Sequence, residues 1–249
     1  MSSVAVMLIA MGLADAVRRL THAMWVPLVV APVVVVACAA LSGLWHLGDF
    51  PLLAIAVAAS IGWVLLCARA ERTGEHQGAP LAVFGIALAT LILLSGWASD
   101  VGGLVERWSS WVQMPGVGGV SPGRLLMVVG VVLLQFVTGN QLVRLVLGSV
   151  GAVKPEGQPQ PSDRLKGGRL LGPMERLLIL GLGLAGQLAA ATAVVAAKSI
   201  IRFPEINAQK ARENGNIGID FDLGDITEYF LVGSFASWII AFGGLALAQ

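Results

Sequence analysis

The sequence predicts an all-α, polytopic helical membrane protein with six transmembrane helices, or seven if the N-terminal segment also spans. Two observations predict this fold class. Hydrophobic residues make up 56% of the 249 residues and charged residues only 12%, whereas about a quarter of a soluble domain is charged. The apolar residues also recur in runs of roughly twenty, the length that crosses a bilayer as a helix.

Each apolar run is expected to form a helix, because lipid offers an exposed backbone no hydrogen-bonding partners. Pro27 and Pro32 are expected to kink or break the first run. Residues 1–17 lack a preceding basic stretch, which favours an uncleaved span or an interfacial helix over a secretory signal. Residues 103–112, GLVERWSSWV, are typical of a short interfacial helix. The six runs cover residues 24–44, 51–67, 79–98, 125–147, 177–197 and 228–248.

The distribution of basic residues predicts the orientation of these spans. Most lysines and arginines fall on one side of the membrane when Arg18 and Arg19 are placed in the cytoplasm. Residues 99–123 are then external and the C-terminus is cytoplasmic. The N-terminus is also cytoplasmic, unless residues 1–17 span, in which case it is external.

A segment rich in proline, glycine and charge divides the chain. Residues 151–172 include the sequence VKPEGQPQPSDRLKGG, a composition that is typical of a flexible linker. We expect this linker in the cytoplasm. It separates an N-terminal membrane region, residues 1–150, from a C-terminal transmembrane hairpin, residues 173–249. The first region contains four spans and the N-terminal apolar segment.

Small residues recur at three- or four-residue spacing on both helices of the expected hairpin. Such faces let helix backbones approach closely in lipid, which favours packing between the two helices; an oligomer contact is the alternative. Gly181, Gly183 and Gly186 also match the pattern GxGxxG, but inside a membrane helix this pattern does not indicate dinucleotide binding. The two faces consist of Gly183, Gly186, Ala190, Ala193 and Ala197, and of Gly233, Ser237 and Ala241.

Polar side chains interrupt the apolar fourth and fifth runs. Polar groups disfavour contact with lipid, so two interpretations stay open. They form hydrogen bonds to neighbouring helices or emerge into the cytoplasm, or they line a pore or cavity. The residues concerned are Gln135, Thr138, Asn140, Gln141 and Gln187.

Charged residues are expected where the hairpin meets the external surface. A helix from Gly172 to Arg202 would be about 45 Å long at roughly 1.5 Å per residue, which exceeds a membrane core of roughly 30 Å. Lys198 and Arg202 would then share a face at the external boundary, where Glu228 begins the last run. The three residues are interpreted either as helix capping and snorkelling or as a charged vestibule or gate.

Several classes of function are not indicated by the sequence. A net charge of +1 does not predict nucleic-acid binding. Cys38 and Cys67 lie inside apolar runs and are expected to be free, and the histidines lack metal-ligand spacing. We therefore predict no metal, no cofactor and no catalytic residues, and we do not expect an enzyme.

Three motifs in the C-terminal third form a recognisable pattern. Residues 168–176 read GRLLGPMER, residues 197–203 read AKSIIRF and residues 228–234 read EYFLVGS. Together they resemble the pattern GRLxGxxER…AAKSIxRF…EYFLxG of an uncharacterised family of bacterial inner-membrane proteins, a domain of unknown function. The resemblance implies a location in the bacterial inner membrane. It also implies that five charged residues belong to one module: Glu175, Arg176, Lys198, Arg202 and Glu228.

These observations favour a channel-like or transport-related protein that is embedded in the lipid bilayer. We expect it to assemble as a homo-oligomer or with a membrane-protein partner. The alternative is a non-catalytic membrane subunit or scaffold that anchors a partner protein through the linker or an external loop.

Overall fold

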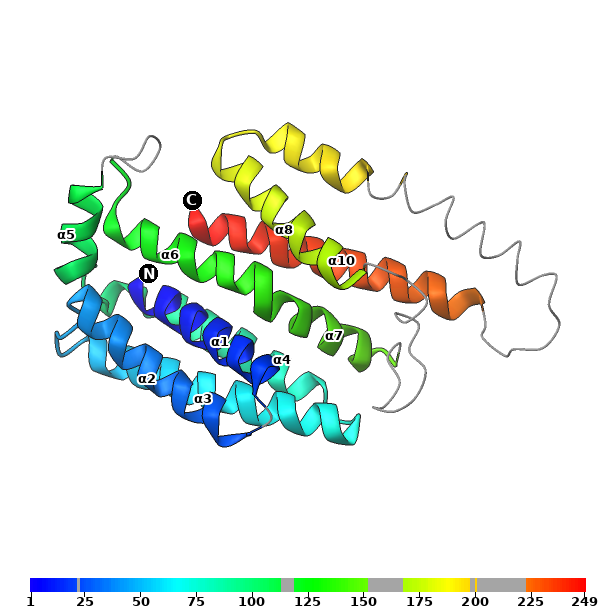
Figure 1. The fold of residues 1–249 in the computed structure, drawn as a ribbon, viewed down its shortest axis with the longest axis horizontal. Coiled ribbons are helices and arrows are strands. Elements are labelled where there is room, and N and C mark those ends of the chain that lie inside the picture. The colour runs from blue at the N-terminus through cyan, green and yellow to red at the C-terminus, as the bar shows by residue number, and fades with distance from the viewer. Residues whose placement is uncertain (22, 113–118, 152–167, 198–199, 201–222) are drawn as a thin grey trace.

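The computed structural model describes residues 1–21, 23–112, 119–151, 168–197, 200 and 223–249, excepting the side chains of residues 168–170 and 223–228 (Figure 1). All regular secondary structure in these ranges is helical. The predicted all-α class is therefore confirmed for the described part of the chain.

The first three apolar runs form three helices, and the proposed interfacial segment forms a fourth. Pro32 lies inside the first of them, which continues unbroken. Cys38 and Cys67 are free, as expected. The helices are α2 (Trp25–Ser42), α3 (Asp49–Thr73), α4 (Gly78–Leu93) and α5 (Gly103–Trp111).

Four helices are long and apolar enough to cross a membrane, which supports membrane association of the protein. They are Trp25–Ser42, Asp49–Thr73, Pro122–Ser149 and Tyr229–Ala248. The total of six or seven spans stays a prediction, because α4 has only 16 residues.

The N-terminal segment forms α1 (Ser2–Leu20), which runs through the interior of the bundle (Figure 1). It packs against α2, α3 and α6 (Pro122–Leu133). Ser2 donates a hydrogen bond to the carbonyl oxygen of Ser99 at 3.1 Å. The N-terminus therefore lies at the end of the bundle that holds residue 99, and Arg18 lies at the other end. This arrangement fits the alternative in which the first segment also spans.

The fourth run forms one long span whose centre is a π-helical turn. It comprises α6, the π-helix η2 (Leu134–Thr138) and α7 (Gly139–Ser149). The Ser121 side chain caps α6 by accepting a hydrogen bond from the backbone N–H of Arg124. π-Helical turns are rare and are frequently found at functional sites, which draws attention to the centre of this long helix.

The expected continuous helix across the fifth run is wrong. Helix α8 (Gly168–Leu184) ends, and a separate helix, Leu188–Ala197, follows. The break is a Schellman turn: Gly186 has φ +76°, its N–H bonds to the Gly183 carbonyl at 3.0 Å, and the Gln187 N–H bonds to Leu182 at 2.8 Å. Figure 1 shows Leu188–Ala197 running back toward the side from which α8 comes.

This break also corrects the small-residue face that was predicted on the fifth run. Gly186 lies in the turn, and Ala193 and Ala197 are exposed, so the five positions do not form one packing face. Ala190 is half-buried on the second helix. Gly183 alone contacts α10 (Leu223–Ala248) closely, through the side chain of Leu245.

The face predicted on the sixth run is packed inside the protein, against more than one helix. Gly233 approaches Leu147 of α7. Ser237 is bonded to a side chain of α8, and Ala241 packs with Ile179 and Ala191. The three residues of this face thus contact α7, α8 and the helix that follows α8, and an oligomer contact through this face stays a prediction.

The C-terminus lies beside the start of α6. The Nε of Arg124 donates a hydrogen bond to the carbonyl oxygen of Ala248 at 3.1 Å. The sequence placed residues 99–123 and the C-terminus on opposite sides of the membrane, whereas Arg124 and Ala248 lie at the same end of the bundle; the side of the membrane that each meets stays a prediction. The reversal after α8 explains the difference, because it adds one change of direction before α10.

A close crossing of α1 and α6 generates a stability prediction. A Cβ at Gly130 would lie 3.0 Å from the Ala5 carbonyl oxygen and 3.2 Å from the Leu8 Cβ. Gly130→Val is expected to lower the free energy of unfolding by about 1–3 kcal/mol, because the helices must separate. Thermal unfolding in detergent measures this change. Gly85→Val is the control, since nothing lies within 4 Å of its Cβ position; an equal loss in both variants would contradict the close crossing.

Candidate functional site

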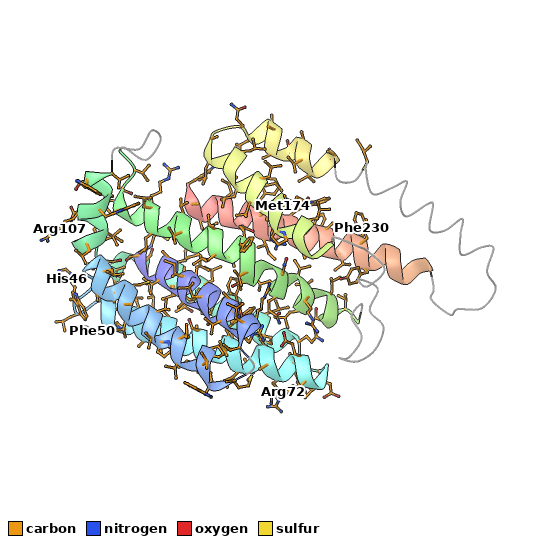
Figure 2. The ribbon with its side chains drawn as sticks, viewed as in Figure 1. His46, Phe50, Arg72, Arg107, Met174 and Phe230 are labelled. Atoms are coloured by element: carbon orange, nitrogen blue, oxygen red, sulfur yellow. The ribbon has the colours of Figure 1, made fainter. Side chains whose placement is uncertain are left out.

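Charged side chains in the described chain occupy two kinds of position. Arg72 and Arg107 point outward at opposite ends of the bundle (Figure 2). Other charged residues lie inside: the exposed fraction is 0% for Asp15, 7% for Glu175 and 1% for Arg176. An ionised group without water needs partners in the protein, so these three residues define where the site lies.

Asp49 is also buried, but it lies at the start of α3 and joins two loops. Its carboxylate accepts hydrogen bonds from the backbone N–H and the hydroxyl of Ser99, at 2.9 and 2.5 Å. It also accepts one from the backbone N–H of His46 at 3.1 Å. These bonds hold the loop after α2 against the loop after α4, which is a structural role.

Arg176 is surrounded by partners from three elements. Its Nε donates to the carbonyl oxygen of Gln135 in η2 at 3.0 Å. Its Nη1 donates to the Ser237 hydroxyl at 3.0 Å, and its Nη2 donates to the Asn140 side-chain oxygen at 2.6 Å. All three nitrogens are thus bonded within the protein. We call these residues, with Glu175 and Trp238, the Arg176 cluster.

The Arg176 cluster lies near the centres of two of the four helices that are long and apolar enough to cross a membrane. Gln135 is at the centre of Pro122–Ser149, and Ser237 is near the centre of Tyr229–Ala248. Glu175 supplies a neighbouring negative charge and accepts a hydrogen bond from the Trp238 indole at 3.0 Å. The cluster therefore holds one acid and one base away from both surfaces.

A second group of buried polar residues surrounds Asp15. The Trp63 indole N–H is shared between the two carboxylate oxygens of Asp15, at 3.2 and 3.0 Å. Arg18 lies 3.5 Å from Asp15 and 3.1 Å from Glu71. The Gln141 side chain donates to Glu71 at 3.0 Å. We call these five residues the Asp15 cluster.

The π-helical turn lies between the two clusters. Arg19 of α1 donates to the carbonyl oxygen of Val137 at 2.9 Å, and Arg176 of α8 donates to that of Gln135 at 3.0 Å. Two carbonyls of η2 thus accept hydrogen bonds from arginines on different helices. The Gln135 side chain also donates to the carbonyl oxygen of Ile240 in α10 at 2.8 Å.

The predicted polar residues of the fourth run come together here. Gln135, Thr138 and Gln141 are 0%, 1% and 5% exposed. Gln135, Asn140 and Gln141 bond to neighbouring helices, as one of the two interpretations expected. A pore lining stays a prediction. Gln187 is exposed in the turn after α8, apart from these four residues, and its role stays a prediction.

The structure does not describe the charged cluster that was predicted at the external boundary. Lys198 and Arg202 lie outside the described residues, and so does the side chain of Glu228. Their pairing stays a prediction, although the single long helix that was to align the two cations is not present.

Sequence reasoning did not identify the Asp15 cluster. Asp15 is an acid inside an apolar segment with an arginine three positions later, and an ionisable residue in such a segment is a functional candidate. That signal was available. Trp63 and Glu71 carried no local signal, because their partners are far away in the sequence.

No protein-family model, curated protein or solved structure matches the chain. The resemblance in the C-terminal motifs therefore stays a prediction, and function is argued from geometry. Among the described residues, no group of three or more His, Cys, Asp or Glu side chains is placed to hold a metal ion.

Removal of the Arg176 charge is expected to destabilise the protein strongly. Arg176→Gln replaces the three guanidinium nitrogens by one shorter amide, which cannot donate to the Gln135 carbonyl, Asn140 and Ser237 together, and it removes the positive charge beside Glu175. We expect the free energy of unfolding to fall by about 3–5 kcal/mol. Denaturation in mixed micelles measures it. Arg107→Gln at the exposed surface should change it by less than about 0.5 kcal/mol; similar losses in both variants would mean that the cluster does not stabilise the fold.

Proposed function

We propose that the chain is a channel-like, transport-related membrane protein in which an ion enters the bundle through the Asp15 cluster. The observation that carries this proposal is the burial of Asp15 and Arg176 among helices of membrane-spanning length. A charge at the centre of a membrane helix costs about 2.5–3.5 kcal/mol on insertion scales, and such residues mark ion and substrate pathways.

The Asp15 cluster supports a stepwise entry route from the surface. The side chain of Glu71 is 28% exposed, that of Arg18 is 13% exposed and that of Asp15 is fully buried. From the surface to the interior, the acidic Glu71, the basic Arg18 and the acidic Asp15 thus follow one another. A pathway needs sites that attract an ion without trapping it, and a base shared by two acids meets that requirement.

The other half of α1 supports a closed resting state. Residues 4–11 are apolar and nearly inaccessible, and they run from the Asp15 cluster toward the opposite end. A hydrophobic constriction of this kind blocks ions by excluding water. In the proposed mechanism this part of α1 is the barrier, and conduction requires it to open.

The proposed location is a bacterial inner membrane, in a multi-pass arrangement supported by the C-terminal motifs and the four long apolar helices. Arg18, Arg69 and Arg72 support a cytoplasmic position for their end of the bundle. The C-terminus beside Arg124 is then on the opposite side. An exposed apolar stripe on α10 suits lipid or a second copy of the chain: Leu231, Phe235 and Ile239.

The proposal predicts ion flux by the pure protein in liposomes. Asp15→Asn keeps the side-chain volume but removes the charge, and is expected to lower the flux by about tenfold or more, equivalent to roughly 1.4 kcal/mol in the barrier. Asp100→Asn is the control, because Asp100 is exposed at the other end of the bundle. If the folded protein carries no ion under any gradient or voltage, transport is the wrong function.

A second candidate function is a non-catalytic membrane subunit or scaffold that anchors a partner protein. It is favoured by the complete bonding of Arg176, since a fully paired network makes a rigid support. The expected result is a stoichiometric partner that co-purifies from native membranes while liposomes show no flux. Flux without any partner would contradict this candidate.

A further inference from the structure

Buried polar atoms without a direct hydrogen-bond partner occur in both the Asp15 cluster and the π-helical turn. Among the described residues these atoms are the Arg18 Nε, the Gln135 Oε1 and the Thr138 Oγ1, together with the hydroxyls of Ser3 and Ser42 elsewhere. Gln135 and Thr138 both belong to the π-helical turn, and Thr138 is 1% exposed. Buried polar groups of this kind are normally satisfied by protein or by internal water, so the turn calls for a water molecule as a partner.

Thr138 lies near the carboxylate of Asp15. Its hydroxyl is near enough to the Asp15 carboxylate to stabilise the negative charge there, but it has no hydrogen-bond partner of ordinary distance and angle. Polar groups just beyond direct contact are commonly bridged by a water molecule. A hydroxyl and a carboxylate offer such a water one partner each, and the Arg18 Nε is a further unpaired donor in the same cluster.

The charges around Asp15 favour a proton at this place. Asp15 and Glu71 share one arginine, and Arg18 is closer to Glu71 than to Asp15, 3.1 against 3.5 Å. A fully buried carboxylate whose cation is engaged elsewhere is costly as an anion. Adding one proton removes that cost and leaves Arg18 paired with Glu71.

We propose that Asp15 is a proton-binding site, reached through a water molecule that bridges Thr138 and Asp15, and that the transported ion is H⁺. This inference rests on the proposed transport function and names its substrate. The groups that act on Asp15 are the charged Arg18 and Arg19, the titratable Cys67 and the neutral Trp63 and Thr138. Glu71 lies beyond Arg18, and Gln141 donates to Glu71.

The transfer conserves charge and atoms. A proton from the bulk solvent passes to the bridging water, and this water passes a proton to the Asp15 carboxylate. Asp15 becomes the neutral acid, and the ion pair between Arg18 and Glu71 is unchanged. The bridging water ends as water, because it receives one proton and donates another.

The test compares Thr138→Val, which removes the hydroxyl without changing the size of the side chain, with Thr138→Ser, which restores it. The protein is reconstituted in liposomes that contain a trapped pH dye, which reports proton flux. In a second measurement, infrared spectroscopy follows the carboxyl band of Asp15 after a pH jump. We expect Thr138→Val to slow both proton flux and the appearance of the band by about tenfold, the rate equivalent of one lost hydrogen bond. Thr138→Ser should recover both, and Thr192→Val, at an exposed helix position, should change neither.

The outcomes separate this inference from the function on which it rests. Flux of K⁺, Na⁺ or Cl⁻ without proton flux would overturn the inference and leave transport standing. Absence of all flux would overturn transport itself. Asp15→Asn identifies the infrared band by abolishing it. If no band responds to pH, or if Thr138→Val behaves as the parent protein does, the water-bridged proton site is wrong.

Discussion

The packing of the C-terminal half depends on the guanidinium of Arg176. Helix α8 delivers it to a backbone carbonyl of η2, an amide of α7 and a hydroxyl of α10. A charge removed from water costs several kcal/mol unless such partners surround it. Contacts between apolar helices in lipid provide little preference for one register, because lipid tails are equally apolar. The guanidinium supplies such a preference, since its three hydrogen bonds join α8 to η2, α7 and α10 in this register.

The π-helical turn transmits this constraint to the rest of the bundle. Its carbonyls accept hydrogen bonds from Arg176 on one side and from Arg19 of α1 on the other. The same turn carries Thr138, which faces Asp15. A shift of α1 that changes the Asp15 cluster must therefore move the backbone that holds Arg176. Two sets of charges from distant parts of the chain are joined through five residues of one helix.

The features that the sequence predicted are those with a local signal. The apolar runs became helices because their length and composition are read within one segment, and Gln135 and Gln141 were found for the same reason. The partner of Asp15 was not predictable, because Trp63 is 48 residues away and looks like any apolar residue. Gly186 was misread for a different reason. A glycine that lets two helices approach and a glycine that ends a helix share the same small-residue spacing, and only its φ of +76° distinguishes them.

That glycine has a consequence for the topology of the whole chain. A segment that turns back carries everything downstream of it in the opposite direction. The Schellman turn at Gly186 adds one reversal between α8 and α10, and the C-terminus ends beside Arg124 instead of beside Arg18. The end of the bundle at which α10 finishes thus depends on one residue that adopts a left-handed backbone.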